Sequence, residues 1–323
     1  TSRGAVFEVS FPEKEEQYVV VDAYNGGSSI TIEPENRLVK GATRYNNGGV
    51  PDNFANYFMM EFSHPVIEYG TYNGDTLLHH QTDVAADYTC AYLKFDVPAG
   101  EKLTIRTASS FISPEQAAIN FNREVADADV QLISGKAREQ WNNYLGRVEA
   151  EGGTDEQFRT FYSCLYRTLL FPREFYEFDS QGNPVYYSPY DGNVHDGYMY
   201  TDNGFWDSFS SQFPLTNILH PTMQGRYMNA LLAAQEQCGW LPSWSAPGET
   251  GGMLGNHSIS LLADAWAKGI RTFDPEKALK AYAHEAMNKG PWGGANGRGF
   301  WKEYFELGYV PYPESMGSSA QTM

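Results

Sequence analysis

The sequence predicts an α+β protein in which the end of an antiparallel β-sandwich is followed by a set of helices. Two observations predict this order. Residues 5–106 form short apolar or alternating segments between turn residues, and beyond residue 135 the apolar residues recur at helical spacing. A chain of 323 residues also favours two domains over one. We therefore expect a β-sandwich over residues 1–135, a connecting helix over 136–153 and a helical domain over 154–323.

The predicted strands include residues 18–21, 29–32 and 57–62, and the last clear strand covers 102–106. Glycine pairs such as Gly26-Gly27 supply the turns, because glycine reaches positive φ without steric cost. Alternating strands joined by short turns favour an antiparallel sandwich.

Helix starts are indicated by capping patterns. Ser113, Pro114 and Gln116 predict the first helix, with Ser113 as its N-cap. Thr154 and Gln157 form a second capping box. An apolar stripe follows this box: Phe158, Phe161, Tyr162, Leu165 and Leu169.

The connecting helix is indicated by one apolar face between residues 136 and 145: Ala137, Trp141, Tyr144 and Leu145. Further helices are predicted after Pro221, over 261–268, and after the Asp274-Pro275-Glu276 start signal. The short loops between them imply antiparallel helix pairs.

Charge and composition exclude several classes of partner. Forty acidic against 23 basic residues give a net charge of −17, which disfavours nucleic acid and anionic membranes. No apolar run is long enough to cross a bilayer, and Thr1 does not begin a signal peptide. The three cysteines show neither a disulfide framework nor zinc spacing. The acidity suits a hard cation or a neutral substrate, although a solvated acidic surface is the more common explanation of such a charge.

Two irregular stretches carry the candidate chemistry. Residues 186–207 are dense in Tyr, Asp, Gly and His, and they end with Asp202, Trp206 and Asp207. A tryptophan beside a carboxylate offers an apolar platform for a sugar face and an acceptor for its hydroxyls. The alternative is that Trp206 is a core residue and Asp207 a helix N-cap.

The second stretch covers residues 238–257 and contains Trp240, Trp244, Asn256 and His257. The two tryptophans could line a pocket the size of a sugar ring, or pack at a helix corner. His257 could donate to a substrate hydroxyl, although a lone histidine is more often structural. No second ligand supports a histidine metal site.

Several segments, in order and spacing, resemble glycoside hydrolase family 92. They are residues 141–153, 165–167, 200–207, 239–244, 253–257, 263–265, 268–270 and 307–311. Residues 1–135 match only as a generic sandwich. The resemblance implies a calcium-dependent, inverting exo-α-mannosidase, with a β-sandwich and an (α/α)6 barrel of which this chain would contain the first part.

Site residues follow from the same resemblance. Trp206 and Asp207 correspond to the sugar-binding pair of the subsite for the departing mannose. The candidate substrate-binding residues are then Trp206, Asp207, Asp202, Trp244, His257 and Asn256. Inversion needs a general acid and a general base on opposite faces of the ring. An ungapped alignment with the family places Gly317 at the position of the acid. With a local shift, Glu314-Ser315 matches the family's glutamate-serine context, and the acid would then be Glu314.

The sequence departs from the family at two positions. Asn256 stands where the family usually has an aspartate, and Ser210 where it has an arginine. The base and the Ca²⁺ ligands belong to a later part of the family pattern, so no metal ligand is assigned here. We expect the chain to be an internal fragment that is inactive by itself.

The resemblance further implies a mannose-containing glycan as substrate and a secreted, periplasmic or cell-surface location. Two other functions compete with the enzyme. One is a non-catalytic glycan-binding protein that kept the Trp-Asp platform, and the other is a structural module without a ligand. Linkage preference, α-1,2 or a related linkage, is not determined by these segments.

Overall fold

The structure is a computed structural model that describes residues 1–12, 16–253, 255–292 and 296–311. The chain divides into two compact units. The first contains Thr1–Asn46, Asn53–Gly146 and Glu177–Val185, and the second contains Asn47–Asp52, Arg147–Tyr176 and Tyr186–Met323. The domain boundaries predicted at residues 135 and 153 stay a prediction.

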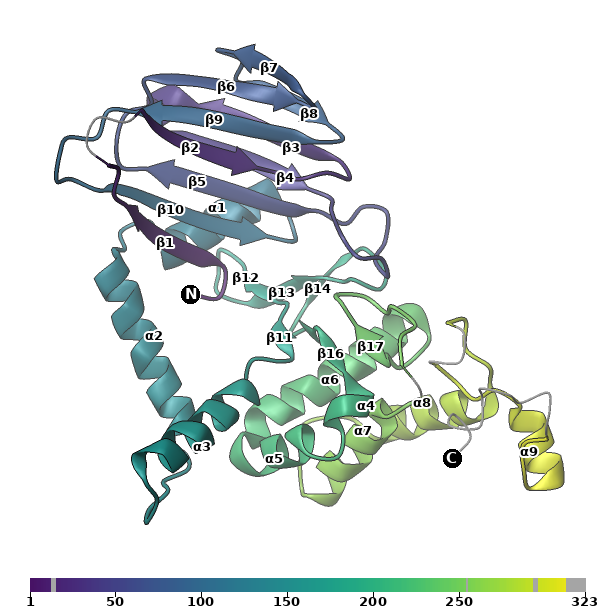
Figure 1. Ribbon diagram of the computed structural model, residues 1–323. Helices are drawn as coiled ribbons and strands as arrows, with labels where there is room; N and C mark the ends of the chain where they lie inside the picture. The colour runs from purple at the N-terminus through teal and green to yellow at the C-terminus, as the bar shows by residue number, and fades with distance from the viewer. Residues whose placement is uncertain (13–15, 254, 293–295, 312–323) are drawn as a thin grey trace. The chain divides into compact units, whose positions relative to one another are not determined.

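The first unit is a β-sandwich of two antiparallel sheets (Figure 1). The six-stranded sheet has the order β1-β10-β5-β4-β3-β8, with β1 (Gly4–Val9), β10 (Leu103–Ser110), β5 (Asn56–Phe62), β4 (Leu38–Thr43), β3 (Ser28–Glu33) and β8 (Asp83–Ala86). The four-stranded sheet has the order β2-β9-β6-β7, with β2 (Gln17–Asp22), β9 (Thr89–Phe95), β6 (Glu68–Asn73) and β7 (Thr76–His79). The 3-10 helix η1 (Pro34–Asn36) joins β3 to β4.

The core of this unit forms between the two sheets because alternate residues of each strand point inward. Ile30, Ile32 and Phe62 come from the six-stranded sheet, and Val21 and Leu93 come from the other sheet. All five side chains are buried. Burial of each such side chain contributes about 1.5–3 kcal/mol.

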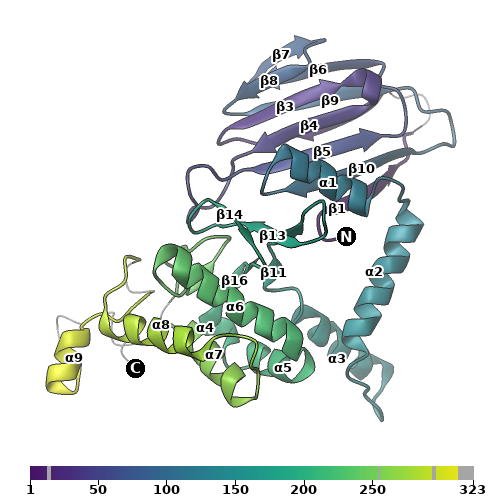
Figure 2. The same cartoon turned by 180° about the vertical axis from the view of Figure 1, so that it is seen from behind.

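Helix α1 (Pro114–Glu124) covers one face of the six-stranded sheet, across β5 and β10 (Figure 2). Its N-cap is Ser113, whose hydroxyl accepts from the Gln116 amide at 3.1 Å, as the capping pattern predicted. Phe121 and Val125 pack against Ala108 of β10. The strand before this helix runs on to Ser110, four residues beyond the predicted strand end.

The predicted connecting helix begins earlier than the sequence indicated. Helix α2 covers Val130–Leu145, and Asp129 caps it by accepting from the Leu132 amide at 2.7 Å. The start was missed because an aspartate before an apolar segment is common outside helices. The apolar face expected on this helix is not buried, since α2 contains no buried residue.

The second unit is mainly helical. Its helices are α3 (Asp155–Arg167), α4 (Phe205–Ser208), α5 (Gln212–Leu219), α6 (Pro221–Cys238), α7 (Ser258–Ala267), α8 (Pro275–Met287) and α9 (Trp301–Leu307). Helices α5 to α8 pack on one another, with α6 against α5, α7 and α8 (Figure 2). Buried Met228, Leu261 and Ala265 lie on α6 and α7. The fold class, a β-sandwich followed by helices, is thereby confirmed, whereas closure into an (α/α)6 barrel stays a prediction.

Short strands lie between α3 and α7. They are β11 (Arg173–Glu174), β12 (Glu177–Phe178), β13 (Pro184–Tyr187), β14 (Val194–Asp196), β15 (Tyr200–Thr201), β16 (Asn203–Gly204) and β17 (Trp244–Ser245). Strand β12 and the first half of β13 belong to the first unit. Strand β11 pairs with β15, and β16 pairs with β17. Strands of two or three residues are too short to show a period of two in the sequence.

Helix ends in the second unit follow the predicted signals. Thr154 and Gln157 form the capping box of α3, with both reciprocal hydrogen bonds present. Asp274 caps α8, and Gly269 follows the end of α7. Across the described ranges, no helix combines the length and the hydropathy that a bilayer crossing requires.

Candidate functional site

A cavity of about 430 Å³ in the second unit contains three of the candidate residues. This volume lies within the range of small-molecule sites. The cavity is lined by two carboxylates, one indole, one phenyl ring, and small polar and apolar groups: Phe171, Asp202, Asn203, Gly204, Asp207, Ser208, Gln212, Trp244, Ser245 and Ala246. Residues from positions 171, 202–212 and 244–246, far apart in sequence, therefore meet at one concave surface.

Asp202 is held between two strand pairs. Strand β15 before it is bonded to β11, and strand β16 after it is bonded to β17. The residue itself has φ of 60°, in the left-handed region that non-glycine residues adopt rarely. Such a conformation costs about 1–3 kcal/mol and is maintained only where the surroundings fix it.

The Asp202 carboxylate forms an ion pair with Arg173, with 2.6 Å between Oδ2 and Nη2. Burial raises the pKa of Asp202, and the Arg173 guanidinium opposes that rise. Arg173 comes from β11, directly opposite Thr201 in the register. The pairing of two short strands thus places a cation against a cavity carboxylate.

Asp207 and Trp206 lie on the one-turn helix α4, but only Asp207 lines the cavity. Consecutive residues of a helix point about 100° apart, and on α4 the side of the helix that carries Asp207 and Ser208 faces the cavity while Trp206 does not line it. Trp206 is 47% exposed. The start of α4 is fixed by Ser208, whose hydroxyl shares its one hydrogen between two acceptors at 2.8 Å, Asn203 Oδ1 and the Gly204 carbonyl.

Trp244 packs its ring directly against the backbone of Gly204. A Cβ at Gly204 would lie 2.3 Å from two indole carbons, so no larger residue fits without moving the ring. The register of β16 and β17 places these two residues opposite each other. The indole is therefore fixed as one wall of the cavity by a glycine across the sheet.

The segment that carries Trp244 is organised by the buried carboxylate of Glu249. It accepts from the backbone amides of Ser243 at 2.6 Å, Gly251 at 2.8 Å and Trp244 at 3.4 Å. Burial raises the pKa of Glu249, while these amide donors favour the ionised form. Sequence reasoning did not identify Glu249, because an acidic residue beside a Pro-Gly pair is typical of exposed loops.

Asn256 and His257 lie outside the lining of this cavity. Asn256 donates to the buried carboxylate of Glu285 at 2.5 Å and accepts from the Ser258 hydroxyl at 2.8 Å. His257 stacks on Phe209, with ring centroids 4.3 Å apart. Both residues contact neighbouring structure at the start of α7, and the structure does not bring them together with Asp202, Asp207 and Trp244.

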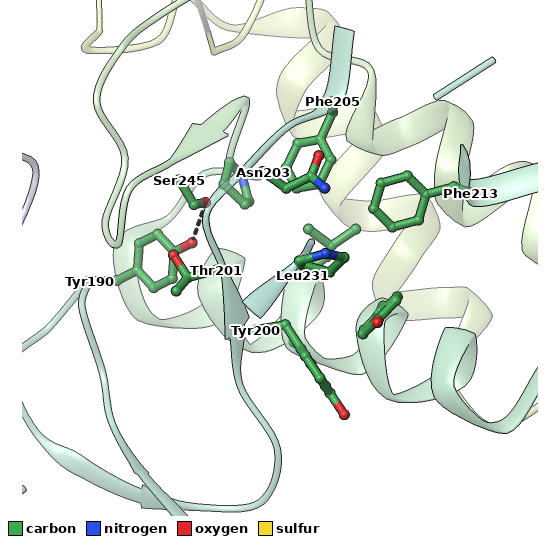
Figure 3. Close-up of a pocket in the computed structure, with 12 residues that line it drawn as sticks. Tyr190, Tyr200, Thr201, Asn203, Phe205, Phe213, Leu231 and Ser245 are labelled. Carbon is green, nitrogen blue, oxygen red and sulfur yellow. Dashed lines mark hydrogen bonds between the residues drawn. The ribbon is translucent and has the colours of Figure 1, made fainter. Parts of the chain in front are cut away.

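A second, less open cavity of about 20 Å³ lies beside the first, and Asn203 and Ser245 line both (Figure 3). Its walls are mostly aromatic and aliphatic, and Figure 3 shows the hydrogen bond between Tyr190 and Ser245, 2.8 Å long. Phe205 and Phe213 lie on another side of this space. It has room for about one water molecule and is too small for a sugar.

The remaining sequence predictions concern the acid and the metal. Glu314 lies outside the described residues, so its surroundings are not assigned. Within residues 1–12, 16–253, 255–292 and 296–311, no group of three or more His, Cys, Asp or Glu side chains could hold a metal ion. We therefore assign no calcium ligand among them and derive no step through a metal.

Sequence reasoning missed four residues that build the cavity: Arg173, Gly204, Gln212 and Glu249. Gln212 donates its amide to the Thr168 carbonyl at 2.9 Å, which ties α5 to the segment before Phe171. Only Gly204 left a signal, as a glycine directly before the aromatic pair Phe205-Trp206. Arg173 and Gln212 depend on contacts between distant segments, whereas Glu249 is bonded within its own loop.

Two carboxylates, an indole and amide groups around one cavity define the kind of site that binds a neutral, polyhydroxylated ligand. The family comparison agrees with this class. Residues 116–323 match the glycosyl hydrolase family 92 catalytic domain, and residues 1–110 match the glycosyl hydrolase family 92 N-terminal domain. The chain belongs to glycoside hydrolase family 92.

Solved structures support this assignment. A family GH92 inverting mannosidase from Bacteroides thetaiotaomicron is similar with a TM-score of 0.95 and 79% sequence identity. The match covers 97% of this chain and 42% of that one. A GH92 α-mannosidase from the same organism has a TM-score of 0.85 at 24% identity, over 97% of this chain and 42% of that one, and shows the same fold.

A curated relative, an uncharacterized secreted glycosidase from Arthroderma benhamiae, is 25% identical over 230 residues. The match covers 68% of this chain and 25% of that protein. The chain thus spans less than half the length of each of these three relatives.

Proposed function

We propose that the protein is an inverting, exo-acting α-mannosidase that removes terminal mannose from mannose-containing glycans such as N-glycans. The observation that carries the proposal is the cavity in which Asp202, Asp207 and Trp244 meet. The relative at 79% identity is an inverting mannosidase, which supports the choice of sugar and of stereochemistry.

In this proposal Trp244 is the platform for the apolar face of the mannose ring. Its indole cannot swing toward Gly204, because the two are already in contact. Asp207, which lies exposed on α4, and Asp202, which is held by Arg173, accept hydrogen bonds from ring hydroxyls. Carboxylates on a rigid turn and a one-turn helix allow such contacts with little ordering cost.

The other candidate residues are proposed in supporting roles. Trp206 is exposed beside Asp207 and could contact a sugar outside the cavity. Asn256 and His257 lie at the start of α7, and we propose that they contact parts of the substrate outside the cavity. Glu314 is proposed as the general acid, which protonates the departing glycosidic oxygen while a carboxylate elsewhere activates water on the opposite face.

Calcium dependence and location are proposed from family membership. A Ca²⁺ ion would be held by protein oxygen ligands that lie outside the described residues, and it would bind hydroxyls of the sugar. A secreted, periplasmic or cell-surface location agrees with the curated relative, a secreted glycosidase. The linkage, α-1,2 or a related one, remains part of the proposal.

Mannose release from α-1,2-, α-1,3- and α-1,6-mannobiose by the full product of the gene tests the proposed activity, with the anomer recorded by proton NMR. We expect β-mannose as the first product and loss of turnover after calcium chelation. Asp207→Asn is expected to lower kcat/KM by roughly 10²-fold or more, as removal of a charged contact to substrate does. Release of α-mannose first would contradict inversion. Mannoside binding without any turnover would favour the non-catalytic glycan-binding alternative.

A further inference from the structure

The ion pair between Arg173 and Asp202 is set by the register of two short strands. Arg173 on β11 lies opposite Thr201 on β15, and Asp202 follows Thr201 directly. The neighbouring pair of β16 with β17 fixes the chain on the other side of Asp202. The backbone of each partner is therefore fixed by a strand pair, which keeps the two side chains within reach of each other.

Asp202 is the less exposed partner, at 20% of its side chain against 51% for Arg173. The carboxylate therefore depends on Arg173 for charge compensation more than the guanidinium depends on Asp202. Among the described residues that line the cavity, the charged ones are Asp202 and Asp207, and both are acidic. Arg173 is thus the cation that balances charge at this wall.

The elements around Asp202 carry few other charges. Glu174 on β11 accepts from the Tyr176 hydroxyl at 3.0 Å, and Asp207 lies on α4. Glu249 accepts from backbone amides in the loop that contains β17. All three are acidic, so none of them compensates the charge of Asp202. Burial raises the pKa of Asp202, and Arg173 is the group that lowers it.

We propose that Arg173 is a positioning residue of the candidate sugar site, which holds the Asp202 carboxylate ionised and oriented at the cavity wall as an acceptor for substrate hydroxyls. The inference deepens the proposed function, on which it rests. Arg173 acts through Asp202, and its role is distinct from a general contribution to folding.

The probe is methyl α-mannoside, with binding measured by calorimetry from pH 4 to pH 8. Arg173→Met removes the charge and keeps the chain length, Arg173→Lys keeps the charge, and Asp202→Asn removes the carboxylate. Arg159→Met, at an exposed position of α3, is the matched control.

The expected result is a change in the pH dependence of binding. In Arg173→Met the midpoint at which binding is lost on acidification should rise by about one pH unit or more, because an adjacent cation lowers an aspartate pKa by about that amount. Arg173→Lys should restore most of the wild-type profile, and Arg159→Met should leave it unchanged. In the Asp202→Asn background, Arg173→Met should have no further effect.

A purely structural role would weaken binding equally at every pH, with no rescue by lysine, and would overturn the inference. If the wild-type chain does not bind the mannoside, the proposed function fails. The effect of Arg173 on Asp202 is then tested separately, by titration of the Asp202 carboxyl. In carbon-13 NMR of Asp-labelled chain, the Asp202 signal, assigned from Asp202→Asn, should titrate at higher pH in Arg173→Met than in wild type. An unchanged titration overturns the role of Arg173.

Discussion

At the scale of single residues, the candidate site is built by contacts that sequence spacing does not reveal. Asp202 and Asp207 could be predicted as a pair because they are close in sequence. That Trp244 joins them depends on the pairing of β16 with β17, two strands of two residues each. Asp202 also requires the rare left-handed conformation, which no residue pattern around it indicated.

The contact between Gly204 and Trp244 gives the first residue-scale prediction. Gly204→Ala places a Cβ 2.3 Å from the indole, so the ring must leave its position. We expect a loss of about 1–3 kcal/mol in the free energy of unfolding, as for overpacked sites, and at least roughly tenfold weaker mannoside binding. Gly135→Ala is the control, because nothing lies within 4 Å of a Cβ there. Unchanged binding in Gly204→Ala would show that the ring does not form the platform.

The buried carboxyl of Glu285 gives a prediction about pH. Burial raises the pKa of Glu285 to about 7 from an ordinary value of 4.5. It accepts from the amides of Leu241 at 2.7 Å and Gly297 at 2.6 Å. Between pH 4.5 and 7 the folded chain binds more protons than the unfolded chain at this group. Its contribution to the free energy of unfolding therefore falls as pH rises through this window and is constant above it.

Glu285→Gln should remove that titration. The free energy of unfolding, measured in urea at pH 4.5, 6 and 8, should then vary less with pH in the variant than in wild type, by up to about 3 kcal/mol. Glu139→Gln, at an exposed position of α2, should keep the wild-type slope. Identical slopes in wild type and Glu285→Gln would show that folding does not raise the pKa of Glu285.

At the scale of elements, the sequence was most informative where local chemistry determines structure. Capping residues predicted the starts of α1, α3 and α8, because the side chain that caps a helix lies within three residues of the amide it bonds. It was least informative at the short strands β11 and β15 to β17. These exist only through partners that are distant in the chain.

The capping box of α3 is open to a direct test. Thr154 accepts from the Gln157 amide at 3.3 Å, and the Thr154 amide donates to the Gln157 side chain at 2.9 Å. Thr154→Ala should lower the free energy of unfolding by about 1 kcal/mol, because one amide of the first turn loses its acceptor. Thr154→Ser keeps the hydroxyl and should stay close to wild type. Equal stability of the alanine and serine variants would show that the box contributes nothing.

At the scale of the whole molecule, the change of apolar period from two to 3.6 separated a sandwich from a helical region, and the structure confirms both. The resemblance that suggested family 92 rested on segments between residues 141 and 311, and the family matches extend it to residues 1–110 and 116–323. The apolar period does not determine whether the helices close into a barrel, because closure depends on which helices pack together and not on local sequence pattern.

The central claim is that the cavity of Asp202, Asp207 and Trp244 binds a terminal mannose. The most direct measurement is a crystal structure of the chain soaked in methyl α-mannoside well above its Kd. We predict one sugar in the cavity, with its apolar face on the Trp244 ring and its hydroxyls within hydrogen-bond distance of both carboxylates. A sugar bound elsewhere, with this cavity occupied by solvent alone, would contradict the account.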